Sequence, residues 1–341
     1  MRQTITPVPP GSRARPPWAV ASVLGPQWAR SVLTDRARTV IGTRAELLDT
    51  DPAARVAPHP GVRVLITGWG TEPLTADVLD RFPSLELVLH AAGTVHGIVT
   101  DDVWERGIRV CTAASANAVA VADFTLAQIH LSVKNMWRLS LRARAVRGPV
   151  PRAGIRGLDG ATVGLLGLGH IGRLVARRLA GHDLRVLAHD PYADARHADE
   201  LGLRLAGIET VVASSDVLSL HAPLNDSTRH MLPEPLLDLM PRDATLINTA
   251  RGALIDQDGL TRFLTRRDDV FALLDVTEPE ELPPGHPLFH LPNVLVSPHI
   301  AGSLGSEVAR LGDLVAAELV RFADGDALRH ELTQDVLART A

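Results

Sequence analysis

Three residues suited to acid–base and anion-binding chemistry, Arg251, Glu280 and His299, each follow a short apolar run typical of a buried strand. The runs are residues 245–248, 270–274 and 294–296. In an open sheet of parallel strands, ligands bind beyond the carboxyl ends of the strands. We therefore expect the three side chains to lie at the same edge of one sheet.

Together these side-chain types are suited to hydride transfer to a 2-keto acid. Arginine presents a planar fork of donors to a carboxylate and to a carbonyl oxygen. Histidine titrates near neutral pH, so it can give a proton to a developing alkoxide or take one in reverse. A nearby carboxylate would orient the imidazole and favour its protonated form. Taken singly, Arg251 could be an exposed helix-start residue, Glu280 a solvated loop acid and His299 a capping histidine. Their joint placement favours catalysis.

A glycine-rich turn precedes these strands in the chain. Residues 163–172 read as a buried strand that runs into G-x-G-x-x-G, made by Gly167, Gly169 and Gly172, and a helical pattern follows. The first glycine permits the tight turn, the second leaves room for phosphates, and the third lets the helix pack on the strand. A lone match is weak. Its place between a strand and a helix predicts a dinucleotide pyrophosphate at the helix N-terminus.

Asp190 ends the next predicted strand. A carboxylate there can accept hydrogen bonds from the adenine-ribose hydroxyls and would repel a 2′-phosphate, which favours NAD over NADP. The alternative is a surface aspartate that caps the turn at Pro191. Further candidate cofactor residues are the helix-start residues His170 and Ile171 and the strand-end residues His221, Ala222 and Pro223.

Composition limits the class of protein. The chain has 341 residues, 45% hydrophobic and 22% charged, with a formal net charge of −4. This length accommodates two domains, and the mild negative charge predicts no general attraction to nucleic acid or anionic membranes. Cys111 is the only cysteine, which excludes an internal disulfide and fits a reducing compartment. No signal peptide, membrane span or metal site is visible, and we expect a cytoplasmic protein.

Short strands alternating with helices predict an α/β protein with parallel sheets. Residues 1–17, rich in Pro and Arg, are expected to form a disordered or loosely docked arm. The predicted domains are a discontinuous substrate domain, residues 18–134 with 304–341, and an NAD-binding domain, residues 135–303. Within the latter, residues 135–158 are rich in Arg and lack acidic residues. They could form a nucleic-acid arm, but the overall acidity of the chain favours a solvated linker or a subunit contact.

The region 163–302 resembles the D-isomer-specific 2-hydroxyacid dehydrogenases, of the glyoxylate/hydroxypyruvate reductase and phosphoglycerate dehydrogenase-like kind. The motifs are GLLGLGHIG, LHAPLNDSTRHML, LINTARGALID, LLDVTEPEEL and SPHIAG, and the resemblance reaches back to AAGTVHGIV and SANAVAVADFTLAQI. It implies a Rossmann-type doubly wound parallel sheet inserted into a smaller flavodoxin-like α/β substrate domain. It also implies NAD as cofactor, interconversion of a 2-keto acid and a D-2-hydroxy acid, and a homodimer with residues 135–158 at the contact.

The resemblance further implies roles for individual residues. Arg251 would bind the substrate carboxylate and carbonyl, His299 would be the acid/base, and Glu280 would be its partner. Backbone N–H groups around Gly93 and Thr94 would hold the substrate carboxylate. The cofactor would also contact Thr228, Thr249, Ala250 and Asp275.

This chain departs from the family pattern at several positions. Where many members read G-x-G-x-D, it has AAGTVH, so the Asp is missing and His96 is added. Asp123 replaces the usual Glu of the long helix. Trp69 follows a strand where members place pocket-lining residues, so we expect it to line the substrate pocket, with a core tryptophan as the alternative. An NAD(H)-sensing corepressor or scaffold on the same fold is the competing function.

Overall fold

The structure is a computed structural model, and it describes residues 18–49, 59–152 and 155–337. The predicted arm at 1–17 lies outside the described residues. Contacts divide the chain into a first unit, Met1–Ala113 with Val308–Leu332, and a second unit, Ala114–Glu307 with Thr333–Ala341. Within the described ranges, no helix is long and apolar enough to cross a membrane.

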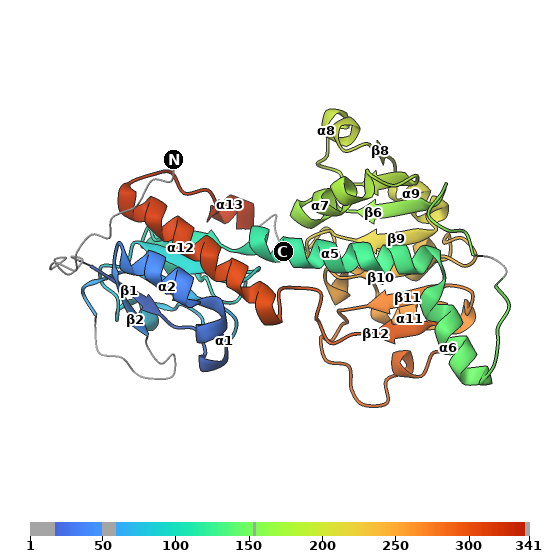
Figure 1. Ribbon diagram of the computed structural model, residues 1–341, viewed down its shortest axis with the longest axis horizontal. Helices are drawn as coiled ribbons and strands as arrows, with labels where there is room; N and C mark the ends of the chain where they lie inside the picture. Colours follow the sequence, from blue (N-terminus) through green and yellow to red (C-terminus); the bar gives the residue numbers. More distant parts are fainter. Residues whose placement is uncertain (1–17, 50–58, 153–154, 338–341) are drawn as a thin grey trace, which may run out of the picture. The chain divides into compact units, whose positions relative to one another are not determined.

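The first unit is built on a six-stranded sheet (Figure 1). Its strands, in spatial order, are β13 (Glu331–Leu332), β5 (Arg109–Thr112), β4 (Leu87–His90), β3 (Val62–Thr67), β1 (Ala19–Ser22) and β2 (Glu46–Asp49). Strands β1 to β5 pair in parallel, and β13 adds to β5 in the antiparallel direction. The order 2-1-3-4-5 is that of a flavodoxin-like sheet.

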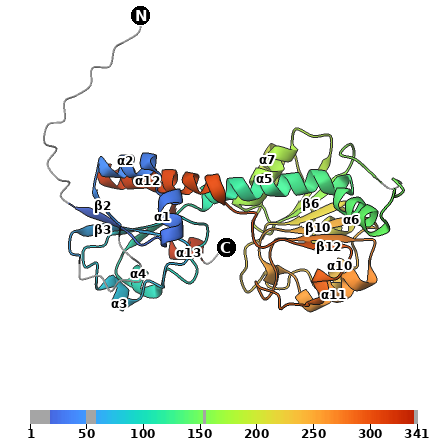
Figure 2. The same cartoon turned by 60° about the horizontal axis from the view of Figure 1, so that its bottom comes forward.

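Helices cover both faces of this sheet. In Figure 2, α2 (Asp35–Gly42) and α12 (Ala309–Asp324) lie over one face, and α3 (Ala76–Leu79) and α4 (Asp101–Glu105) lie over the other. Helix α1 (Pro26–Val32) precedes α2 and contacts α12. Leu311, Val315 and Leu319 of α12 follow helical spacing and are buried. The late segment of the chain therefore completes the core of the first unit.

The second unit is built on a seven-stranded parallel sheet. Its strands, in spatial order, are β12 (Val294–Val296), β11 (Phe271–Leu274), β10 (Thr245–Asn248), β9 (Val217–Leu220), β6 (Thr162–Leu166), β7 (Arg185–His189) and β8 (Arg204–Leu205). The chain starts at β6, winds out to β8, and then crosses to β9 on the other side of β6. This is the doubly wound order, and the reversal between β6 and β9 is where such sheets bind ligands. The predicted fold class is confirmed.

Two hydrophobic cores, one on each face of this sheet, position the strands. One core packs α5 (Ala114–Val133), α7 (His170–Leu179) and α8 (Ala195–Glu200), and the other packs α9 (Ile208–Ser214), α10 (Glu234–Leu237) and α11 (Gln257–Arg266). Figure 2 shows α5 and α7 on the face opposite α10 and α11. Every residue of β9, β10 and β11 is buried, as expected for parallel strands covered on both faces. The remaining helical segments are α6 (Met136–Val146), α13 (Gln334–Leu337) and the 3₁₀ turns Gly252–Leu254, Pro287–Phe289 and Gly305–Val308.

The division between the units differs from the domain boundary expected at residue 134. Helix α5 belongs to the second unit, where it packs on α7, β9 and β10. The hydroxyls of Thr125 in α5 and Thr249 after β10 are 3.0 Å apart. Asp123 of α5 forms an ion pair with Arg178 of α7 at 3.1 Å. These contacts join α5 to the sheet that follows it in the chain.

Two arginines of the basic segment 135–158 are paired inside the second unit. Arg138 of α6 donates to Asp243 at 3.1 Å and to the carbonyl of Asp269. Arg156 forms an ion pair with Asp216. Burial lowers the pKa of Arg138 from its ordinary value, and the charge of Asp243 partly opposes that effect. Because these cations have partners within the chain, they weigh against a nucleic-acid arm.

Gly312→Ala should destabilise the first unit. A Cβ at Gly312 in α12 would lie 1.8 Å from the carbonyl oxygen of Val32 in α1, so one helix would have to shift. Overpacking typically costs about 1 to 3 kcal/mol, of which the better helix propensity of alanine offsets about 1 kcal/mol. Gly42→Ala is the matched control, because a Cβ there meets nothing within 4 Å. Urea denaturation measures both, and equal stability of the two variants would contradict the packing described here.

Candidate active site

The glycine turn between β6 and α7 packs closely against the end of β9. Gly167 has a φ of +101°, and a Cβ there would lie 2.5 Å from the nitrogen of Ala222. A Cβ at Gly172 would lie 2.1 Å from the carbonyl oxygen of Gly167. At Gly169, in contrast, a Cβ meets nothing within 4 Å. The turn is therefore tight where it meets protein and open at the glycine that should leave room for phosphates.

Helix α7 begins at this turn with Gly169 as its N-cap and with His170 and Ile171 as its first residues. The N-cap makes no side-chain hydrogen bond to the helix. The first N–H groups of a helix have no partner within the helix, and together with the helix dipole they favour an anion. The predicted phosphate site thus has the local geometry that its sequence motif requires.

Asp190 holds the glycine turn from the end of β7. One carboxylate oxygen accepts the N–H of Leu168 at 2.6 Å, and the other accepts the N–H of Tyr192 at 2.8 Å. The second bond is the turn-capping role considered as the alternative, and the first connects the carboxylate to the phosphate turn. Each carboxylate oxygen can accept more than one hydrogen bond, so these contacts leave room for a ribose hydroxyl.

The segment after β9 lies beside the glycine turn and carries an uncharged histidine. His221 is buried, and burial lowers its pKa to about 4, so its imidazole is uncharged at pH 7. Its Nε2 lies 3.1 Å from the hydroxyl of Ser219. The hydroxyl of Thr228 donates to the carbonyl of Pro223 at 2.6 Å, which closes the loop on itself. The imidazole of His221 is thus buried beside Ser219 within this segment.

His299 and Glu280 form a side-chain hydrogen bond at the carboxyl edge of the same sheet. The Nδ1 atom of His299 contacts Oε1 of Glu280. The imidazole and the carboxylate side chains are 51% and 55% exposed, so both reach solvent. A hydrogen bond to the carboxylate places a proton on Nδ1 and leaves Nε2 as the nitrogen that can exchange a proton with a ligand. The structure thus brings together two of the three residues with which the sequence analysis began.

Arg251 is held largely buried after β10. Its Nη1 donates to the carbonyl of Ala250 at 2.7 Å. Burial lowers the pKa of Arg251 from its ordinary value, and the charge of Glu280 opposes this effect, so the two groups lie within electrostatic reach. Asn248 fixes the loop by accepting the Ala250 N–H and donating to the Arg251 carbonyl. Sequence reasoning missed this asparagine, although a polar residue that ends a buried strand is a turn-forming signal.

Asp275 organises the loop that carries His299. Its buried carboxylate accepts the hydroxyl of Ser297 at 2.5 Å and the N–H groups of Ile300 and Ala301 at 2.9 and 2.8 Å. Its carbonyl accepts the N–H of His299 at 3.0 Å. The sequence predicted Asp275 only as a cofactor contact. In the structure its carboxylate holds the Ser297 side chain before the histidine and the backbone after it.

Trp69, Gly93 and Thr94 belong to the first unit and lie after its strands. The carbonyl of Gly93 accepts the Thr112 hydroxyl at 2.7 Å. The hydroxyl of Thr94 accepts the N–H of His96 at 3.2 Å, so the added histidine is part of this loop. The indole of Trp69 packs at a tilt on Trp28, with ring centroids 4.9 Å apart. Trp69 is therefore part of an aromatic pair rather than an isolated side chain.

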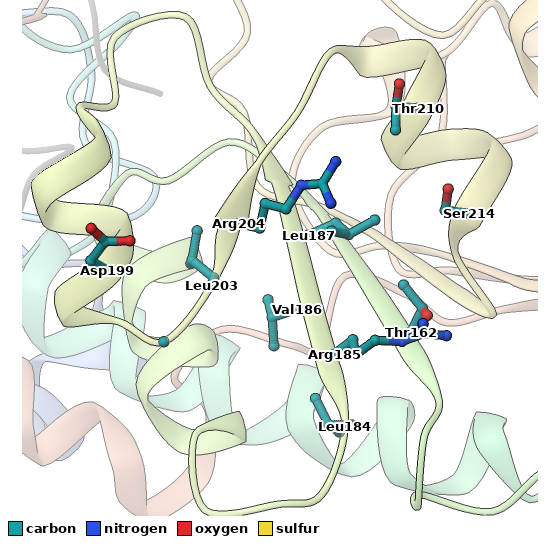
Figure 3. A pocket seen from close by; sticks show the side chains of 11 residues that line it. Thr162, Leu184, Arg185, Val186, Leu187, Asp199, Leu203, Arg204, Thr210 and Ser214 are labelled. Carbon is teal, nitrogen blue, oxygen red and sulfur yellow. The ribbon is translucent and has the colours of Figure 1, made fainter.

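A pocket of about 690 Å³ lies elsewhere in the second unit (Figure 3). Its lining comes from the start of β6, from β7, α8 and β8, and from α9. The starts of the strands form the edge opposite to the one that carries the glycine turn and His299. None of the predicted site residues lines it. In the described part of the chain, no group of three or more His, Cys, Asp or Glu could hold a metal ion.

Asp275→Asn should loosen the loop around His299. An asparagine would place an NH₂ group against N–H donors, and a buried unsatisfied donor costs about 1 to 3 kcal/mol. We expect that loss in the free energy of unfolding, together with faster amide exchange at Ile300 and Ala301. Asp226→Asn, at an exposed carboxylate, is the control. Native exchange rates in Asp275→Asn would contradict the role assigned to this carboxylate.

Comparison with known proteins gives the family. A sequence model described as "D-isomer specific 2-hydroxyacid dehydrogenase, NAD binding domain" matches residues 129–301. The chain is 32% identical over 271 residues to a glyoxylate reductase of Korarchaeum cryptofilum, covering 78% of this chain and 82% of the relative. It is 35% identical over 261 residues to an (S)-sulfolactate dehydrogenase of Chromohalobacter salexigens, covering 76% and 83%.

Solved structures agree with this assignment. The crystal structure of the TT0316 protein from Thermus thermophilus matches with a TM-score of 0.72 and 30% identity, over 92% of this chain and all of that one (100%). A D-mandelate dehydrogenase of Rhodotorula graminis has the same fold, with a TM-score of 0.79 at 24% identity over 94% of this chain and 98% of that one. The glycine turn, the His–Glu pair, the matched sequence model and these relatives all point the same way: the chain belongs to the D-isomer-specific 2-hydroxyacid dehydrogenase family.

Proposed function

We propose that this chain interconverts a 2-keto acid and a D-2-hydroxy acid with NAD, using Arg251, Glu280 and His299. The observation that carries the proposal is the contact between Nδ1 of His299 and the Glu280 carboxylate at the cofactor edge of a doubly wound sheet. Family membership supports the reaction class. The residue roles rest on the geometry of the second unit.

The residues around the glycine turn fit a dinucleotide. Gly167 and Gly172 allow the close approach of backbone segments, whereas the space at Gly169 is open. Asp190 lies at the turn with its carboxylate toward Leu168. When bound, the nicotinamide of NAD supplies or accepts the hydride. The carboxylate of Asp190 favours NAD over NADP, because it would repel a 2′-phosphate.

In the reducing direction, His299 donates a proton from Nε2 to the carbonyl oxygen of the substrate as negative charge develops there. Glu280 keeps Nδ1 protonated and stabilises the imidazolium before transfer. Arg251 offers its guanidinium fork to the substrate carboxylate and carbonyl oxygen. Its burial strengthens that attraction, because little water competes with the bound anion. In the oxidising direction, His299 takes the hydroxyl proton.

Other assignments complete the proposal. Backbone N–H groups around Gly93 and Thr94 hold the substrate carboxylate, and Trp69 contacts the substrate side chain. Thr228, Thr249, Ala250 and Asp275 contribute to the cofactor site. The protein is a cytoplasmic homodimer with residues 135–158 at its contact. A corepressor or scaffold role is not favoured, because a binding protein has no need of an imidazole paired with a carboxylate beside a buried guanidinium.

Substrate reduction tests the activity directly. We expect NADH absorbance to fall with at least one of glyoxylate, hydroxypyruvate, pyruvate, phenylpyruvate and 2-ketoisocaproate. The opposite reaction should be seen with the matching D-2-hydroxy acid and NAD. Absence of turnover across the panel at every pH tried, with NADH binding intact, would reject the proposal and favour the scaffold role.

His299→Ala should remove the acid/base while leaving the cofactor site unchanged. We expect kcat to fall by about 10² to 10⁴, the usual contribution of general acid–base catalysis, with no change in the dissociation constant for NADH. His290→Ala is the control, because His290 is exposed after the 3₁₀ turn Pro287–Phe289. Undiminished turnover in His299→Ala would remove this residue from the mechanism.

Asp190→Ala should shift cofactor preference. Removal of the carboxylate ends its repulsion of a 2′-phosphate, so the ratio of kcat/KM with NADPH to that with NADH should rise by about tenfold or more. Because the same carboxylate holds the Leu168 N–H, the absolute rates should fall for both cofactors. An unchanged ratio would show that another residue discriminates between the ribose hydroxyl and the 2′-phosphate, and Arg196 would be the next residue to test.

A further inference from the structure

Glu278, two residues before Glu280 in the chain, is held by two side chains from another loop. Its Oε1 accepts Nη1 of Arg229 at 2.7 Å, and its Oε2 lies 2.9 Å from Nε2 of His230. Both oxygens are thus engaged, each by a different side chain. We call Arg229, His230 and Glu278 the Glu278 cluster.

The Glu278 cluster joins loops that follow different strands. Arg229 and His230 belong to the loop after β9, which also carries Thr228, whereas Glu278 belongs to the loop after β11, which carries Glu280. The His230 N–H also donates to the carbonyl of Ala253 in the loop after β10, at 2.8 Å. The backbone of three neighbouring loops is therefore tied together beside the proposed site.

The loop after β11 has several further restraints. A Cβ at Gly252 would lie 2.1 Å from the carbonyl of Thr277, so the Arg251 loop packs directly on this one. The Thr277 hydroxyl donates to the carbonyls of Pro279 and Glu280 at 2.8 and 3.0 Å. The Glu278 N–H donates to the side chain of Gln257 at 3.2 Å. These contacts fix the backbone at Thr277 and Glu278. The carboxylate of Glu278 then attaches this backbone to the loop after β9.

We propose that Glu278 is a positioning residue for catalysis: held by Arg229 and His230, it sets the loop that presents Glu280 to His299. This inference rests on the proposed function of the His299–Glu280 pair. Glu280 and His299 are both half-exposed, so packing alone does not hold the carboxylate against the imidazole. The restraint must come from the loop backbone, and the Glu278 cluster is the charged contact nearest to Glu280 along the chain.

The charge of the cluster is suited to this role near neutral pH. The hydrogen bond from His230 lowers the pKa of Glu278; desolvation opposes that effect, and the bond from Arg229 adds to it. The carboxylate of Glu278 is therefore ionised, and attached to Arg229, at any pH above the ordinary pKa of a glutamate. The attachment to Arg229 is lost only as the pH falls through the lowered pKa of Glu278.

Glu278→Gln tests the inference, with Glu234→Gln as its matched control. Glu234 also accepts two guanidinium groups, Arg266 at 2.7 Å and Arg262 at 2.9 Å, but joins α10 to α11. In Glu278→Gln we expect kcat to fall about 10- to 100-fold, the scale of a small misplacement of a catalytic group, with NADH affinity unchanged. The alkaline limb of the kcat/KM profile for reduction should move to lower pH, because the imidazolium loses its carboxylate. Glu234→Gln should change neither.

A readout independent of turnover is the amide exchange of the peptide 276–281. Exchange should be faster in Glu278→Gln than in the native protein, and native in Glu234→Gln. Arg229→Met should reproduce the effects of Glu278→Gln, and the double variant should add little, as expected for a shared contact. Native kinetics, pH profile and exchange in Glu278→Gln, in an active enzyme, would overturn the inference. Inactivity of the native enzyme across the substrate panel would instead reject the proposed function, and the positioning role with it.

Discussion

Close approach of backbone to backbone at the carboxyl edge of the second sheet is the constraint on which the proposed site depends. Gly167 allows the glycine turn to pack against Ala222, and Gly252 allows the loop of Arg251 to pack against Thr277. A single Cβ at either position would separate loops that follow neighbouring strands. The glycines thus do more than permit turns, since they set the spacing between the groups expected to meet cofactor and substrate. The parallel sheet brings the loops to one edge, and these contacts fix their relative positions.

Within that frame, each charged group is held in a different way. Arg251 is largely buried and restrained by its own loop, whereas His299 and Glu280 remain half-exposed and contact each other. Asp275 is buried and directs its carboxylate to backbone donors. The buried groups therefore supply fixed geometry, and the exposed pair retains the access to water and ligand that proton exchange requires. Such a division is expected where one site must be both pre-organised and able to titrate.

The sequence was sufficient for the strands and for placing Glu280 and His299 at one edge of a sheet, because both depend on local order along the chain. Apolar runs marked the strands, and polar residues after them identified one sheet edge. The sequence could not assign α5 to a unit, because apolar residues such as Val119, Phe124 and Leu131 lie on other sides of that helix than the buried Val121 and Ile129. The apolar pattern therefore marks no single face of α5. The role of Asp275 was hidden for another reason: its partners include backbone N–H groups, which every residue except proline carries. Contacts such as Arg229 with Glu278 join loops far apart in sequence and leave no pattern within either.

The antiparallel strand β13 has a consequence for the order in which the protein is made. Strand β5 lacks its neighbour on that edge until Glu331 and Leu332 have been synthesised, and α12 precedes them only slightly. At ribosomal rates of about 5 to 20 residues per second, the roughly 200 residues of the second unit between Ala113 and Val308 take about 10 to 40 seconds to emerge. The second unit can therefore complete its sheet while the first unit, although begun earlier, still lacks β13 at the edge of its sheet. It also still lacks α12, which covers one face of that sheet. During synthesis the sheet of the second unit is the first to be complete, and in that interval the edge of β5 is open to pairing with other chains.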